Sequence, residues 1–190
     1  SVLVTGVNGI RKSTSVYQDW FPELLAQALV PPLDKEDDGT FALDNLPTGA
    51  NSFFRQLDHM IAILANTEFS NLYRMTQREE QQSGGILPME DYAYLKDAVF
   101  VRYRTLAEIM GVLLVTKAIE GNKNVMVETS GRDVAMFHYI DRFFPREKYN
   151  KLALHFTIND VCHAERSVDR RMEKEVRDGV EAITGGGGVR

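Results

Sequence analysis

Two glycines, a lysine and a serine near the start of the chain have the residue types and spacing of a phosphate-binding loop. Such a loop needs inward-facing backbone N–H groups, a cation, and a hydroxyl that can bind magnesium. Gly6 and Gly9 allow the backbone to turn inward, because neither carries a Cβ. Lys12 supplies the charge and Ser13 the hydroxyl. The pattern therefore predicts a site for the phosphates of a nucleotide, with Mg²⁺ on Ser13.

The match to the phosphate-loop pattern G-x-x-x-x-G-K-[ST] has one departure, since Arg11 stands where the last glycine is expected. This arginine indicates a second cation over the nucleotide, a different loop geometry that is tolerated, or weakened binding. Asn8 and Thr14 complete the expected nucleotide contacts. The alternative interpretation is a strand-turn-helix junction with an incidental lysine. The apolar strand that begins at residue 2 and runs directly into the loop favours the phosphate site.

A second chemical group ends the apolar run 124–128, which we expect to be a buried parallel strand. The run finishes in Glu128 and is followed by Ser130 and Arg132. Ligands of parallel sheets gather at the carboxyl ends of the strands. We therefore expect Glu128 and Arg132 to lie on the same edge as the loop; the alternative is a solvent-exposed turn.

Basic residues follow a third expected strand, 151–158, on a helix capped by Asn159 or Asp160. Arg166 and Arg170 are four residues apart and share one face of that helix. Acidic residues interleave with them, as on an ordinary solvated helix. We favour at least one of these arginines reaching the nucleotide, because phosphoryl transfer requires cations around the transferring oxygens.

The rest of the pattern predicts mainly helices. A helix over 14–20 follows the loop, and Pro22 begins another that ends at Leu29. Apolar residues spaced by three and four predict a long helix from about residue 92 to Gly121. We also expect a short strand at 40–44 and a polar loop over 74–87. Asn51 or Ser52 should cap a helix whose apolar stripe starts with Phe53 and Phe54. Another helix, capped by Ser130 or Asp133, should end at Phe144.

Composition limits the class of protein. The 190 residues suit one domain, and the net charge of -5 argues against nucleic acid and membrane surfaces as partners. The single cysteine indicates a reducing, cytoplasmic compartment. We expect the chain to be a fragment of a longer protein, with further domains or protein partners.

These segments in this order resemble a P-loop small-molecule kinase, and most closely the zeta-toxin-like family. The family's Glu-x-Thr-x-Arg motif is matched by Glu128, Ser130 and Arg132, and its lid-helix arginine by Arg170, with Arg166 behind it. The resemblance implies an α/β, three-layer P-loop kinase fold with a parallel sheet and a helical insertion at about 33–120.

The activity implied is transfer of the γ-phosphoryl group of ATP to a hydroxyl of a small molecule, a nucleotide-sugar in that family. Lys12, Glu128 and Arg170 would be catalytic, and Ser130 and Arg132 would contact the substrate. The family's acidic general base has no clear counterpart; Glu128 and four early aspartates are candidates: Asp34, Asp37, Asp38 and Asp44. The alternative is a catalytically degenerate nucleotide-binding or scaffold domain.

Overall fold

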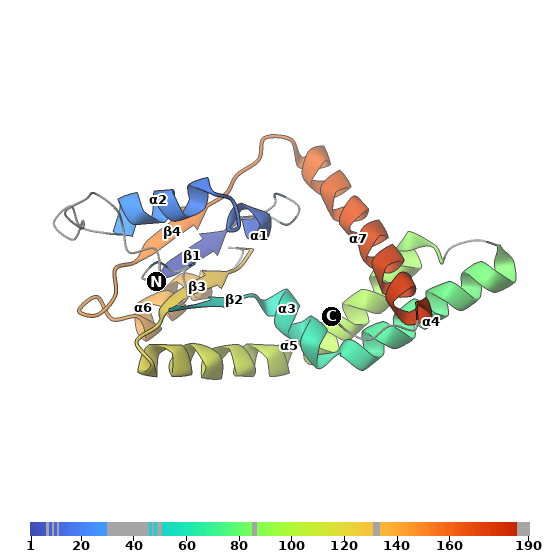
Figure 1. Ribbon diagram of the computed structural model, residues 1–190, viewed down its shortest axis with the longest axis horizontal. Coiled ribbons are helices and arrows are strands. Elements are labelled where there is room, and N and C mark those ends of the chain that lie inside the picture. The colour runs from blue at the N-terminus through green and yellow to red at the C-terminus, as the bar shows by residue number, and fades with distance from the viewer. Residues whose placement is uncertain are drawn as a thin grey trace. The chain divides into compact units, whose positions relative to one another are not determined.

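The computed structural model describes residues 1–6, 8, 10, 12–29, 46, 48, 51–84, 87–130 and 134–185. In chain order its elements are β1 (Val2–Thr5), α1 (Lys12–Ser15), α2 (Trp20–Leu29), β2 (Ser52–Arg55), α3 (Leu57–Leu64), α4 (Asn66–Ser83), α5 (Met89–Glu120), β3 (Asn124–Glu128), α6 (Ala135–Phe143), β4 (Leu152–His155) and α7 (Val161–Thr184). Figure 1 shows these elements along the chain. The chain divides into two compact units, one of Ser1–Leu57 with Met110–Ala164 and the other of Asp58–Ile109 with Glu165–Arg190.

The first unit contains a four-stranded, fully parallel sheet in the order β2-β3-β1-β4 (Figure 1). In the sheet, Val4 pairs with Glu128 of β3 and with Leu154 of β4. Neighbouring parallel strands end at the same edge of a sheet. The residues that follow β1, β3 and β4 therefore lie on the same side of the unit. The sequence-based expectation of an α/β fold with a parallel sheet is confirmed.

Helices cover both faces of this sheet, which gives three layers. On one face, Val4 and Met126 pack with residues of α2 such as Phe21 and Leu25. On the other face, Leu3, Val125 and Val127 pack against α6 and the C-terminal part of α5. Because both faces are buried, β1 and the centre of β3 read as continuous apolar runs rather than as alternating ones.

Strand β2 corrects the sequence-based interpretation of residues 51–64. We expected Phe53 and Phe54 to begin the apolar stripe of a helix, but they lie in the strand, and the helix begins only at Leu57. Spacing alone did not separate the two states, because two adjacent aromatics fit the start of either. The strand also falls inside the range 33–120 that we expected to be a helical insertion. The short strand expected at 40–44 lies outside the described residues.

A buried arginine ends β2. Arg55 is 3% exposed, and its guanidinium lies 5.7 Å from the centre of the Tyr139 ring on α6. A Cβ added to Gly111 of α5 would lie only 2.4 Å from Nε of Arg55. Gly111 therefore makes room for this side chain, at the expense of the helix propensity that a larger residue would bring.

The second unit is helical in its described residues. Its core joins Phe69 and Leu72 of α4, Tyr92 and Val99 of α5, and Val176 of α7. We expected residues 74–87 to be a polar loop, and this was wrong, since α4 continues to Ser83 and ends at Gly84, whose φ is 68°. The last turns of α4 are polar, so the sequence pattern there did not indicate a helix. The helix packs into the core through its first half.

The long helix is confirmed as α5, but only part of its expected stripe is buried. Tyr92 and Val99 belong to the core of the second unit, whereas Leu106 and Leu113 are exposed. Further along the helix, Val115 and Ala118 face the sheet instead. A helix that serves two cores does not present one continuous apolar face.

Two further expectations concern helix ends. Asp160 caps α7, because its Oδ1 accepts a hydrogen bond from the backbone N–H of His163 at 3.1 Å, as expected. The cap residue of α6 is Val134, with no side-chain capping bond, so Ser130 does not cap that helix. Asp133, the other expected cap, lies outside the described residues. Within the described chain, no helix combines the length and apolarity needed to span a membrane.

Candidate functional site

The loop after β1 starts at a glycine that no other residue could replace without strain. Gly6 has a φ of 136°, a region that side chains with a Cβ rarely adopt. A Cβ there would also lie 2.5 Å from the backbone oxygen of Phe156 and 2.7 Å from Cδ1 of Ile10. The expectation that Gly6 lets the backbone turn without a Cβ is thus confirmed. Gly9 and Arg11, expected in the same loop, lie outside the described residues.

Lys12 is buried at the end of this loop and is the first residue of α1. Its side chain is 6% exposed, and Nζ donates a hydrogen bond to the backbone oxygen of Gly6 at 2.6 Å. An ammonium group is costly to bury unless it is bonded to acceptors. The charged group of Lys12 therefore lies next to the Gly6 carbonyl, at the point where the chain leaves β1.

Ser13 and Glu128 join the loop to the neighbouring strand. The Ser13 Oγ lies 2.9 Å from each carboxylate oxygen of Glu128 and donates to that carboxylate. The backbone explains the approach, since Glu128 pairs with Val4 in the sheet and the N–H of Thr129 donates to the Val4 oxygen at 2.9 Å. The expected meeting of the loop with the end of β3 is therefore present for these two side chains.

Gln56 is a third member of this group, which the sequence did not reveal. Its Nε2 donates to Oε2 of Glu128 at 3.0 Å. Gln56 directly follows β2, which neighbours β3 in the sheet. Because the segment was interpreted as a helix, no residue here was expected at the sheet edge. A polar residue following a short aromatic-rich run was the signal that could have found it.

The donor set of this group suits a hard divalent cation. A serine hydroxyl and a carboxylate supply oxygen ligands, which Mg²⁺ prefers, whereas Gln56 turns its amide nitrogen toward the carboxylate. Mg²⁺ usually takes one or two protein carboxylates and completes its shell with water and substrate phosphates. Among the described residues, no cluster of three or more His, Cys, Asp or Glu side chains could hold a metal ion. The Ser13 hydroxyl therefore fits as one ligand of a magnesium ion, with the Glu128 carboxylate beside it.

A histidine and a threonine meet on the other side of β1. Thr5 Oγ1 lies 2.7 Å from Nδ1 of His155, and the Phe156 N–H donates to the Thr5 oxygen at 2.9 Å. Thr5 is buried and His155 is exposed. This pair could not be predicted from the sequence, because it depends on β4 lying directly beside β1.

The other expected nucleotide contacts are exposed. Asn8 and Thr14 have exposed side chains on the loop and in α1. Arg166 and Arg170 are exposed on α7 within the second unit. Their role at a nucleotide stays a prediction.

Of the two residues expected to contact substrate, the structure describes one. Ser130 is exposed, two residues beyond the end of β3. Arg132 lies outside the described residues, as do the four early aspartates considered as bases.

Comparison with known proteins adds no relative: no family model, no curated protein and no solved structure matches the chain.

Proposed function

We propose that the chain binds ATP at the loop between Gly6 and Ser13 and transfers its γ-phosphoryl group to a hydroxyl of a small molecule. The observation that carries this proposal is the pair of 2.9 Å contacts between Ser13 Oγ and the Glu128 carboxylate. These contacts bring a loop with the residue types of a phosphate site next to a carboxylate at the end of the adjacent strand, and phosphoryl transfer uses both groups.

The loop residues would bind and orient the nucleotide. Lys12 would exchange its bond to the Gly6 oxygen for charge-assisted bonds to phosphate oxygens, which carry negative charge. Ser13 would hold the magnesium ion, and Glu128, which accepts the Ser13 hydrogen bond, would orient its hydroxyl. When bound, that ion neutralises charge that develops on the phosphate oxygens.

Glu128 is proposed as the group that takes the proton of the acceptor hydroxyl. As this O–H bond breaks, the acceptor oxygen forms a bond to the γ-phosphorus and the bond to ADP breaks, so that the products are a phosphate ester, ADP and the proton on Glu128. The hydrogen bond from Gln56 fixes one carboxylate oxygen of Glu128, which limits its rotation.

A second candidate is a domain that binds nucleotide without transferring phosphate. Gln56 favours this candidate. It is the polar residue next to Glu128 at this edge of the sheet, and its amide cannot serve as a general base in the way that a carboxylate can. Under this alternative, the loop and Glu128 would serve binding alone.

The experiment that separates the two candidates follows ADP formation from ATP and Mg²⁺, with water and with a panel of hydroxyl-bearing acceptors. The phosphotransferase proposal predicts acceptor-stimulated ADP formation that Lys12→Met abolishes. The matched control is Lys148→Met, an exposed lysine of the same unit. ATP binding without any ADP formation would contradict transfer and favour the second candidate.

A further inference from the structure

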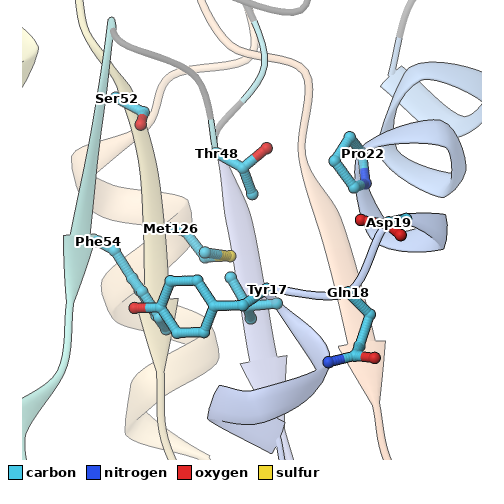
Figure 2. Close-up of a pocket in the computed structure, with 9 residues that line it drawn as sticks. Tyr17, Gln18, Asp19, Pro22, Thr48, Ser52, Phe54 and Met126 are labelled. Atoms are coloured by element: carbon cyan, nitrogen blue, oxygen red, sulfur yellow. The ribbon is translucent and has the colours of Figure 1, made fainter.

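A pocket of about 320 Å³ lies on the face of the sheet covered by α2. Figure 2 shows Gln18 and Asp19 on one side of it, Ser52 and Phe54 on the opposite side, and Tyr17 reaching between them. The volume is in the range of small-molecule sites. The described residues of its lining that matter here are Tyr17, Asp19, Ser52, Phe54 and Met126.

Two residues of this pocket share their strands with residues of the candidate site. Met126 and Glu128 are two residues apart on β3. Phe54 of β2 is two residues before Gln56, which directly follows that strand. Side chains two residues apart on a strand point to the same face, separated by about 7 Å. A ligand that rests on Met126 and Phe54 would therefore extend one side-chain step along the sheet to reach Glu128.

The lining has the chemistry of a site for a hydroxylated molecule with a positive charge. Hydroxyl and amide groups supply donors and acceptors, and Asp19 supplies a carboxylate. The rings of Tyr17 and Phe54 present faces that attract cations and pack against sugar carbons. None of the described residues that line the pocket is basic, so a phosphate or carboxylate would enter without a matching cation.

We propose that this pocket binds a small hydroxylated amine, of the amino-sugar or amino-alcohol class, with its ammonium group at Asp19. If the proposed function holds, on which this assignment rests, that amine is the phosphate acceptor, and one of its hydroxyls faces Glu128. This acceptor class differs from the nucleotide-sugar that the sequence resemblance implies, because a diphosphate does not suit the lining.

The test uses three pyranoses of similar shape and different charge, with no nucleotide present: glucosamine at a mildly acidic pH, glucose and glucuronate. Dissociation constants come from NMR titrations of the whole chain. We expect glucosamine to bind most tightly and glucuronate most weakly. Asp19→Asn should weaken glucosamine about three- to fivefold, the effect of one exposed ion pair, and leave glucose unchanged.

Matched variants separate charge at the pocket from charge elsewhere. Glu23→Gln removes an exposed carboxylate one helical turn from Asp19 that does not line the pocket, and it should leave all three affinities unchanged. Tyr17→Leu should weaken all three sugars; since Tyr17 is 71% exposed, this change leaves the core intact.

Because no nucleotide is present, the result is independent of the phosphate loop. Charge-ordered binding that depends on Asp19 supports the pocket even if ATP does not bind, and in that case only its role as acceptor site fails. Absence of binding by all three sugars, tightest binding by glucuronate, or equal glucosamine affinity in Asp19→Asn would each overturn the assignment, even if ATP binds at Lys12.

Discussion

The hydroxyl of Ser13 lies 2.9 Å from both carboxylate oxygens of Glu128, although 115 residues separate them in the chain. The parallel pairing of β1 with β3 produces this contact, since each strand carries its next residues to the same edge. A contact of this kind gives the carboxylate one fixed position relative to the loop. The proposed reaction depends on that position.

Replacement of Glu128 by glutamine tests the proposed base. Gln can still accept the Ser13 hydrogen bond through its amide oxygen, so the loop contact is retained while the proton acceptor is lost. We expect turnover to fall about 100-fold or more, with a much smaller change in ATP affinity. Steady-state ADP formation and calorimetry measure the two effects. Glu147→Gln, an exposed carboxylate of the same unit, should be inert; unaltered turnover in Glu128→Gln would remove Glu128 from the mechanism.

Replacement of Gly6 by alanine tests the geometry of the loop. Its φ of 136° and the 2.5 Å approach to the Phe156 oxygen leave no room for a Cβ. We expect the free energy of unfolding to fall by about 2–4 kcal/mol, from backbone strain together with overpacking. Urea unfolding measures the loss. Gly121→Ala is the control in the same unit, because a Cβ there meets nothing closer than 3.4 Å; equal stability of the two variants would contradict the loop geometry.

Tyr92 makes the stability of the second unit depend on pH. Its hydroxyl donates to Glu175 at 2.8 Å, and its side chain is 1% exposed. Burial, followed by the Glu175 carboxylate, raises the pKa of Tyr92 well above its usual value of 10.0. The unfolded chain therefore releases this proton at lower pH than the folded one, so the stability from this group is fully present below about pH 10 and is lost above it.

Tyr92→Phe should lower the free energy of unfolding by about 1–2 kcal/mol at neutral pH, because it removes one hydrogen bond to a charged group. Glu175 keeps its ion pair with Lys96, so no carboxylate is left unpaired. The difference from the unaltered chain should shrink as the pH rises above about 10. Urea unfolding at several pH values measures it, with Tyr94→Phe as the exposed control, 77% exposed. A difference that does not change with pH would refute the assignment.

The sequence contained enough to predict the core of the first unit. Apolar runs that end in Gly6 and Glu128 identified two central strands and the edge at which their polar residues meet. Proximity of Ser13 and Glu128 followed from one general property of parallel sheets. The spacing of apolar residues predicted the long helix α5, and Gly121 and Asn122 predicted its end. Asn122 has a φ of 52° in the structure.

What the sequence did not predict depends on packing. Phe53 and Phe54 form a strand because β3 offers them a ladder, and their own spacing does not require it. Leu113 is exposed because α5 turns other residues toward each of two cores. Gln56 and the pair of Thr5 with His155 could not be found until β2 and β4 had been placed in the sheet.

The most direct measurement is a calorimetric titration of ATP with Mg²⁺ into the unaltered chain, Lys12→Met and Lys148→Met. Lys12→Met keeps most of the side-chain volume of a buried residue and removes the charge that now lies against the Gly6 oxygen. We expect the unaltered chain and Lys148→Met to bind equally, and Lys12→Met to bind about 10- to 100-fold more weakly, as the loss of a charge-assisted bond predicts. Equal binding by all three folded proteins, or binding by none of them, would contradict a phosphate-binding loop at this site.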